Sequence, residues 1–99
     1  MKHLLLAAAL AAAWIPQKSG SDSELRGLAV LDSTHAWASG SGGTVLRTQD
    51  GQSWGKIAVT GAEKLDFRDL EVLDASTLVL MSAGPGEDSR IYQIGRAHV

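Results

Sequence analysis

The chain has 99 residues, with 9 Lys or Arg against 11 Asp or Glu, and it contains no run of basic residues. Nucleic-acid binding is therefore not expected, because proteins that read phosphates carry a basic patch. Cysteine is absent, which excludes disulfides, thiolate catalysis and cysteine-based zinc sites.

The N-terminus has the pattern of a secretory signal peptide. Residues 1–3 (MKH) are short and basic, and residues 4–13 (LLLAAALAAA) are apolar and end in small residues that fit an A-x-A cleavage site. The apolar run is shorter than a membrane span requires. We expect residues 1–13 to be a signal peptide and residues 14–24 a polar linker, so that the protein is exported to the periplasm or beyond without a membrane anchor. A buried N-terminal helix is the alternative.

Two segments of similar sequence follow at a separation of 42 residues. RGLAVLD, from Arg26, aligns with RDLEVLD, from Arg68, and small polar residues come next in both. Further along, TVLRT aligns with RIYQ after an insertion of four residues within AGPGEDS. A period of about 40 to 50 residues is typical of propeller blades.

Short β-prone runs separated by turn residues fill both segments, and no helical period of useful length follows the signal helix. The first segment, 25–60, is predicted to hold strands at 25–31, 35–39, 44–48 and 54–60, and the second, 61–93, strands at 67–73, 78–82 and 90–93. We therefore expect an all-β fragment of a β-propeller, with one four-stranded antiparallel blade and an incomplete second blade. Two such blades leave open faces, so we expect the chain alone to be marginally stable or to associate.

The last six residues, 94–99 (IGRAHV), match the translation of a short-read sequencing adapter. We expect them not to be native and the gene to continue beyond Gln93. If they are native, a small independent sheet domain is the alternative.

The turn RTQDGQSW, residues 47–54, resembles an Asp-box, Ser/Thr-x-Asp-x-Gly-x-Thr-Trp, but is one residue short between Asp50 and Trp54. In an Asp-box the Asp carboxylate accepts backbone N–H groups of the turn, the Gly adopts a positive φ and the aromatic residue packs into the blade core. The resemblance gives Asp50, Gly51 and Trp54 these structural roles. An ordinary Asp-Gly hairpin is the alternative.

Four segments, RGLAVLD, AWASGSGGTVLRTQDG, LDFRDLEVLD and GPGEDSRIY, resemble exported bacterial BNR propellers related to photosystem II stability and assembly factors, with sortilin-like proteins as more distant kin. The resemblance implies a propeller of about seven blades that serves as a non-catalytic module for protein binding or complex assembly, without cofactor or metal. Some relatives are named oxidoreductases, but SGSGGT lacks the strand-to-helix context of a dinucleotide loop. A sialidase-like BNR glycoside hydrolase, with catalytic residues in blades outside this chain, is the alternative.

Arg26 and Arg68 are the candidate binding residues. Both stand at the start of the first strand of a segment, and in propellers that strand lines the central channel. Arginines repeated there could form a basic ring that binds an acidic peptide segment of a protein partner. The alternative is a salt bridge with Asp66 or Asp69 that ties one blade to the next.

No residue is predicted to be catalytic. Glu87 and Asp88 are adjacent in a loop and have no fixed separation across a sugar, which paired glycosidase carboxylates require. Tyr92 is expected to pack within a strand. His35, the only His between residues 14 and 93, is expected to be structural, since a lone His cannot build a metal site or a triad.

Overall fold

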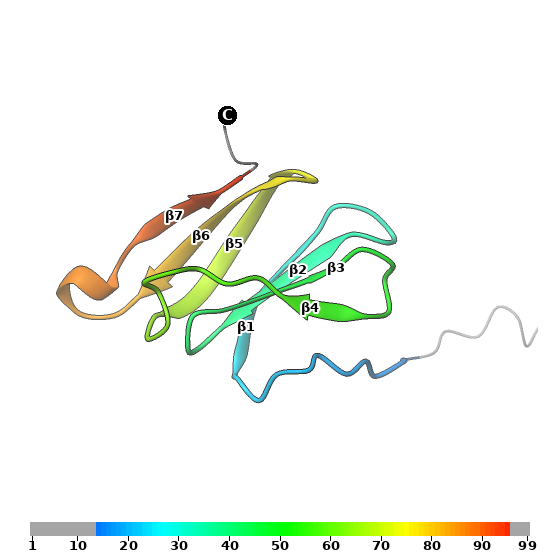
Figure 1. The fold of residues 1–99 in the computed structure, drawn as a ribbon, viewed down its shortest axis with the longest axis horizontal. Helices are drawn as coiled ribbons and strands as arrows, with labels where there is room; N and C mark the ends of the chain where they lie inside the picture. The colour runs from blue at the N-terminus through cyan, green and yellow to red at the C-terminus, as the bar shows by residue number, and fades with distance from the viewer. Residues whose placement is uncertain (1–13, 96–99) are drawn as a thin grey trace, which may run out of the picture.

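The computed structural model describes residues 14–95, which form two antiparallel β-sheets that lie against each other (Figure 1). The first sheet has the strand order β1-β2-β3-β4 and the second the order β5-β6-β7. The predicted signal peptide and residues 96–99 lie outside the described residues. For the residues described, the all-β prediction is confirmed, and the helical structure there is a short 3-10 turn, η1 (Gly86–Asp88). The strands are β1 (Leu25–Val30), β2 (Ala36–Gly40), β3 (Thr44–Thr48), β4 (Trp54–Lys56), β5 (Asp66–Asp74), β6 (Thr77–Ala83) and β7 (Ile91–Ile94).

All seven predicted strands are present, and the fourth is the one whose bounds differ by more than a residue. It was predicted over residues 54–60, but β4 ends at Lys56. The backbone N–H of Ile57 still donates to the C=O of Val45 over 2.8 Å, and the chain then leaves the sheet. Ala62 and Leu65 are buried beyond this point. Burying these apolar side chains between the sheets compensates for the shorter edge strand.

The sequence repeat is also a repeat of strand pairing. The β1–β2 pairing recurs in β5–β6 with both strands shifted by 42 residues. The β6–β7 connection, which contains η1, is four residues longer than the β2–β3 connection, so the predicted insertion is confirmed. The pair Leu28–Ala38, between β1 and β2, corresponds to Leu70–Leu80, between β5 and β6. The pair Ala38–Leu46, between β2 and β3, corresponds to Leu80–Tyr92, between β6 and β7.

The two sheets stack with unlike faces in contact. Because side chains alternate between the faces of a strand, each sheet has two distinct faces. The forward face carries Ala29, Trp37 and Val45 in the first sheet and their equivalents Glu71, Val79 and Ile91 in the second. The rear face carries Leu28, Ala38 and Leu46 in the first sheet and their equivalents Leu70, Leu80 and Tyr92 in the second. The forward face of the first sheet packs on the rear face of the second. One rear face and one forward face therefore remain outside.

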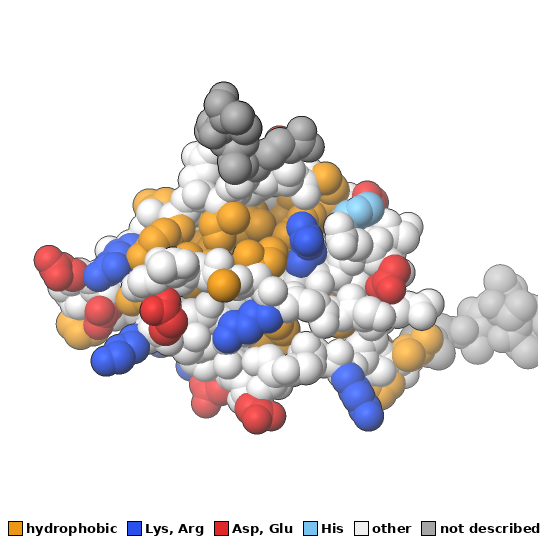
Figure 2. Space-filling model, in the orientation of Figure 1, with side chains coloured by type: hydrophobic (Ala, Val, Ile, Leu, Met, Phe, Trp, Pro, Cys, Tyr) orange, Lys and Arg blue, Asp and Glu red, His pale blue; other side chains and the backbone are white. Residues whose placement is uncertain are grey.

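The core lies between the two sheets. Its buried members are Trp37, Val45, Ala62, Leu65, Phe67, Leu70, Leu78 and Leu80. The rings of Phe67 and Tyr92 meet edge to face with centroids 5.9 Å apart, and Ile94 also packs against this cluster. Ser39 Oγ donates to the C=O of Phe67 over 3.1 Å, so this buried hydroxyl has a partner. Figure 2 shows apolar side chains gathered over the middle of the visible face and charged side chains scattered around them.

Aspartates close the hairpin turns after β1 and after β5. Asp32 Oδ1 accepts the backbone N–H of Thr34 over 2.9 Å and that of His35 over 2.8 Å. Asp74 Oδ1 accepts the backbone N–H of Ser76 over 2.8 Å. These bonds favour the charged carboxylate and hold the pKa of both aspartates below the usual value. The two repeats therefore share a capped turn as well as a strand register.

Residues 14–24, predicted as a polar linker, form a strap along the rear face of the first sheet (Figure 1). The Gln17 side chain accepts the indole N–H of Trp54 over 2.7 Å. Gln17 and Ser19 of the strap line a shallow hollow together with Leu28, Ala38 and Leu46 of the sheet. In this hollow Leu46 is only 2% exposed, whereas Leu28 of β1 is 66% exposed.

Candidate functional site

Arg26 and Arg68 occupy equivalent β-bulges. The pairing of β1 with β2 passes over Arg26, and the pairing of β5 with β6 passes over Arg68. Each arginine is therefore an extra residue without a cross-strand partner. A bulge bends its strand and redirects the side chain of the extra residue. The repeated sequence thus places two arginine side chains at the same end of the stacked sheets.

The two arginines share one carboxylate. Arg26 Nε lies 3.2 Å from Asp66 Oδ1, and Arg68 Nε lies 3.0 Å from Asp66 Oδ2. Arg26 Nη2 also lies 2.7 Å from Glu24 Oε2. The side chains form an alternating series, Glu24–Arg26–Asp66–Arg68, which we call the ion-pair row. It connects β1 to β5, so the salt bridge considered as the alternative role of these arginines is present at Asp66.

Electrostatics hold the row in place at neutral pH. Burial acts to raise the pKa of Asp66, but the hydrogen bond from Arg68 and the charge of Arg26 outweigh it and lower the pKa below its usual value. The side chains of Arg26 and Arg68 are 37% and 55% exposed. Ion pairs this exposed stabilise a fold by only about 0–1 kcal/mol each. A guanidinium has five N–H donors, so each arginine keeps donors that can bind an external carboxylate.

The turn between β3 and β4 is closed by Asp50. Its Oδ1 accepts the backbone N–H groups of Gln52 and Ser53, each over 2.8 Å. Thr48 Oγ1 accepts the N–H of Gly51 over 2.9 Å, and Gly51 adopts a φ of 78°. These contacts show how Asp50 and Gly51 close the turn. They are equally available to an ordinary Asp-Gly hairpin.

Trp54 lies on the rear face and is half-buried, outside the core cluster. Its ring lines a shallow apolar hollow with Leu28 and Leu46, and its indole N–H bonds Gln17 of the strap. The expectation that Trp54 packs into the blade core therefore differs from the structure. The tryptophan in the core is Trp37, 1% exposed, which alternation along β2 places on the forward face.

Replacing Asp50 with alanine should lower thermal stability in a pH-dependent way. The backbone N–H groups of Ser53 and Gln52 lower the pKa of Asp50 to about 2. Because an Asp in an unfolded chain has a pKa of about 3.9, the stabilisation is complete above about pH 4 and is lost as the pH falls toward 2. Thermal unfolding at a series of pH values should show a Tm difference between wild type and D50A that narrows on acidification.

The exposed Asp22 of the strap provides a matched control for this measurement. Asp22→Ala removes the same carboxyl group without opening a capped turn. We expect its Tm to follow that of the wild type at every pH. A D50A difference that stayed constant across the acid range would contradict the assignment of the lowered pKa to the turn.

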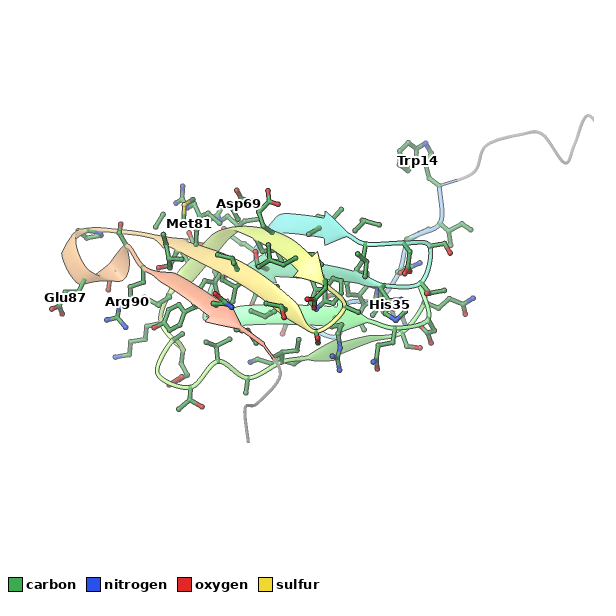
Figure 3. All side chains as sticks on the ribbon, turned by 90° about the horizontal axis from the view of Figure 1, so that it is seen from above. Trp14, His35, Asp69, Met81, Glu87 and Arg90 are labelled. Atoms are coloured by element: carbon green, nitrogen blue, oxygen red, sulfur yellow. The ribbon has the colours of Figure 1, made fainter. Side chains whose placement is uncertain are left out.

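The other candidate residues do not come together. Glu87 and Asp88 are exposed in η1, and Figure 3 shows Glu87 at the opposite end of the molecule from His35. His35 Nδ1 lies 3.0 Å from Asp32 Oδ1 in a capped turn, and Tyr92 packs against the core. Between residues 14 and 95, no group of three or more His, Asp or Glu side chains could hold a metal ion. The same residues include no helix long and apolar enough to cross a membrane.

Sequence reasoning missed one member of the ion-pair row, Glu24. The signal was an acidic residue two positions before each repeated arginine, in ELR and in DFR. Glu24 lies in the predicted linker, just before the first predicted strand at residues 25–31. In both repeats the acid lies two residues before its arginine and forms an ion pair with it.

Comparisons of the chain with protein-family models, with curated proteins and with solved structures each found no match. The fold and the site define the chain as a repeat-built, all-β protein with an arginine at a bulge of each repeat.

Proposed function

We propose that this chain is a β-propeller-type repeat module of an exported protein, and that it binds an acidic segment of a protein partner without catalysing a reaction. Two features support the propeller arrangement. The second sheet repeats the strand pairing of the first, and the sheets stack forward face on rear face. Blades of a propeller repeat one such contact around a ring.

The observation that carries the binding proposal is the ion-pair row. Asp66 holds the guanidinium groups of Arg26 and Arg68 next to each other, and both remain partly exposed. A carboxylate that accepts two parallel N–H groups of a guanidinium forms a strong and directional contact. Arginines already held in position lose less conformational freedom on binding. Neighbouring carboxylates of an acidic peptide therefore fit this pair better than a single anion does.

Changing Arg26 and Arg68 together to glutamine should weaken the binding of a glutamate-rich peptide by about tenfold to a hundredfold. Contacts between exposed charges contribute less than the about 1.5–3 kcal/mol of a fully formed charge-assisted hydrogen bond. A loss of about 1.4–2.8 kcal/mol for the two arginines together corresponds to a factor of ten to a hundred. Titration calorimetry with the full chain measures the change. Arg47→Gln with Lys64→Gln is the matched control, because it removes the same charge outside the row.

Two outcomes would contradict this function. Equal weakening in both double variants would mean that the peptide responds to overall charge rather than to the row. Unchanged binding in the row variant, accompanied by a lower Tm, would mean that the row only connects the sheets. A lysine-rich peptide of the same length should not bind the wild type.

A further inference from the structure

The ion-pair row consists of one unit that occurs twice. Glu24 and Arg26 of the first unit correspond to Asp66 and Arg68 of the second, 42 residues on. The two units are joined where Arg26 meets Asp66. Among the described residues, the Glu24 carboxylate at one end of the row forms an ion pair only with Arg26 of its own unit, and Arg68 at the other end forms one only with Asp66 of its own unit. The row therefore ends in a carboxylate on one side and a guanidinium on the other.

These two ends are complementary to each other. Arg68 is the equivalent of Arg26, which binds the acid of the following unit. Glu24 is the equivalent of Asp66, which binds the arginine of the preceding unit, and the Glu24 side chain is 74% exposed. A further unit with an acid at the position of Glu24 would satisfy Arg68 in the way that Asp66 satisfies Arg26.

The two outer surfaces that carry exposed apolar side chains are also unlike faces, one forward and one rear, like the two faces that meet inside the molecule. On the outer forward face of the second sheet, Met81 is 46% exposed and Ile91 is 76% exposed. Asp69 is paired with Met81 and lies beside it (Figure 3). On the outer rear face of the first sheet, Leu28 and Val30 of β1 are 66% and 64% exposed.

The strap leaves open the strand that such a contact needs. In the internal interface, β5 packs against β1 and β2. In a repeated interface, β1 of the next unit would take the place of β5. Gln17 and Ser19 of the strap line the same hollow as Leu28, but Leu28 and Val30 of β1 remain exposed, so the contacting strand is accessible while the strap stays in place.

We propose that a second copy of this chain docks head to tail, with the rear face of its first sheet on the forward face of the second sheet, and that Glu24 of the second copy pairs with Arg68 of the first. The contact is heterologous, because it joins two different surfaces. Such a contact propagates, and it ends in a ring if the rotation closes or in a filament if it does not. This inference shares Arg68 with the proposed binding of an acidic peptide, but it requires no peptide and is tested without one.

Charge reversal tests the pairing directly. E24R places a second positive charge against Arg68, and R68E places a second negative charge against Glu24. Sedimentation velocity should show that the wild type gains mass with concentration and that each variant alone remains a monomer. An equimolar mixture should assemble again, because the reversed residues of the two variants complement each other and the remaining wild-type ends also pair.

Folding and overall charge need their own controls. Circular dichroism verifies that the variants are folded, and Lys64→Glu changes the net charge as R68E does without touching the row, so it should assemble like the wild type. Ile91→Asp is a second variant, at an exposed side chain of the proposed contact, and it should block assembly with the fold intact. It tests the proposal if a variant of the ion-pair row unfolds. A monomeric wild type at all concentrations, or a mixture that stays monomeric, would overturn the proposal.

Discussion

Replacing Trp37 with alanine is expected to lower the free energy of unfolding by about 3–5 kcal/mol. Trp37 is 1% exposed and lies between the two sheets. Its removal leaves a cavity that the surrounding strands cannot fill, since protein interiors are close-packed. Small domains are stable by only about 5–15 kcal/mol, so a large part of the stability should be lost. Urea unfolding followed by circular dichroism measures the change.

The other two tryptophans provide graded controls for this substitution. Trp14 is 97% exposed, and Trp14→Ala should leave the urea midpoint unchanged. Trp54 is half-buried and bonds the strap, so Trp54→Ala should have an intermediate effect. Equal losses in the three variants would contradict the placement of Trp37 in the core.

Replacing Gly43 with alanine should destabilise the fold by about 2–4 kcal/mol. Gly43 adopts a φ of 65°, and its N–H donates to the C=O of Leu65 over 2.7 Å. A Cβ at this position would collide with the backbone C=O of Ala62. That backbone cannot move away freely, because the side chains of Ala62 and Leu65 are buried in the core.

Gly61 separates the two causes of this loss. It also has a positive φ, 85°, but a Cβ there would have no atom within 4 Å. Gly61→Ala therefore measures the backbone strain alone, and the additional loss in Gly43→Ala measures the collision. If both variants have the same melting temperature, the close approach of residue 43 to residue 62 does not determine stability.

Local turn chemistry and the repeat allowed most of the fold to be predicted from the sequence. Asp and Gly residues marked where hairpins turn, and alternating apolar residues marked the strands between them. The end of β4 at Lys56 was not predictable in this way, because residues 57–60 are β-prone. Beyond Lys56 the chain leaves the sheet, and Ala62 and Leu65 are buried in the core, a tertiary arrangement that no local pattern shows.

The candidate site was predictable only as far as the repeat extends. The period of 42 residues identified Arg26 and Arg68 as equivalent, and the salt bridge considered with Asp66 or Asp69 forms at Asp66. The bulges that aim both arginines at Asp66 depend on strand register. Likewise, the contact of Gln17 with Trp54 joins residues 37 apart, and the sequence of a polar linker does not specify it.

The capped turns and the ion-pair row lie at opposite ends of the strands (Figure 1). Asp32, Asp50 and Asp74 close turns at one end, where short bonds from neighbouring backbone N–H groups hold each carboxylate. The contacts of Arg26 and Arg68 at the other end are between exposed charges, and dissolved salt screens such contacts over about 10 Å at 0.1 M and about 3 Å at 1 M. Raising the ionic strength should therefore loosen this protein from one end only, starting where the two sheets are joined by charge.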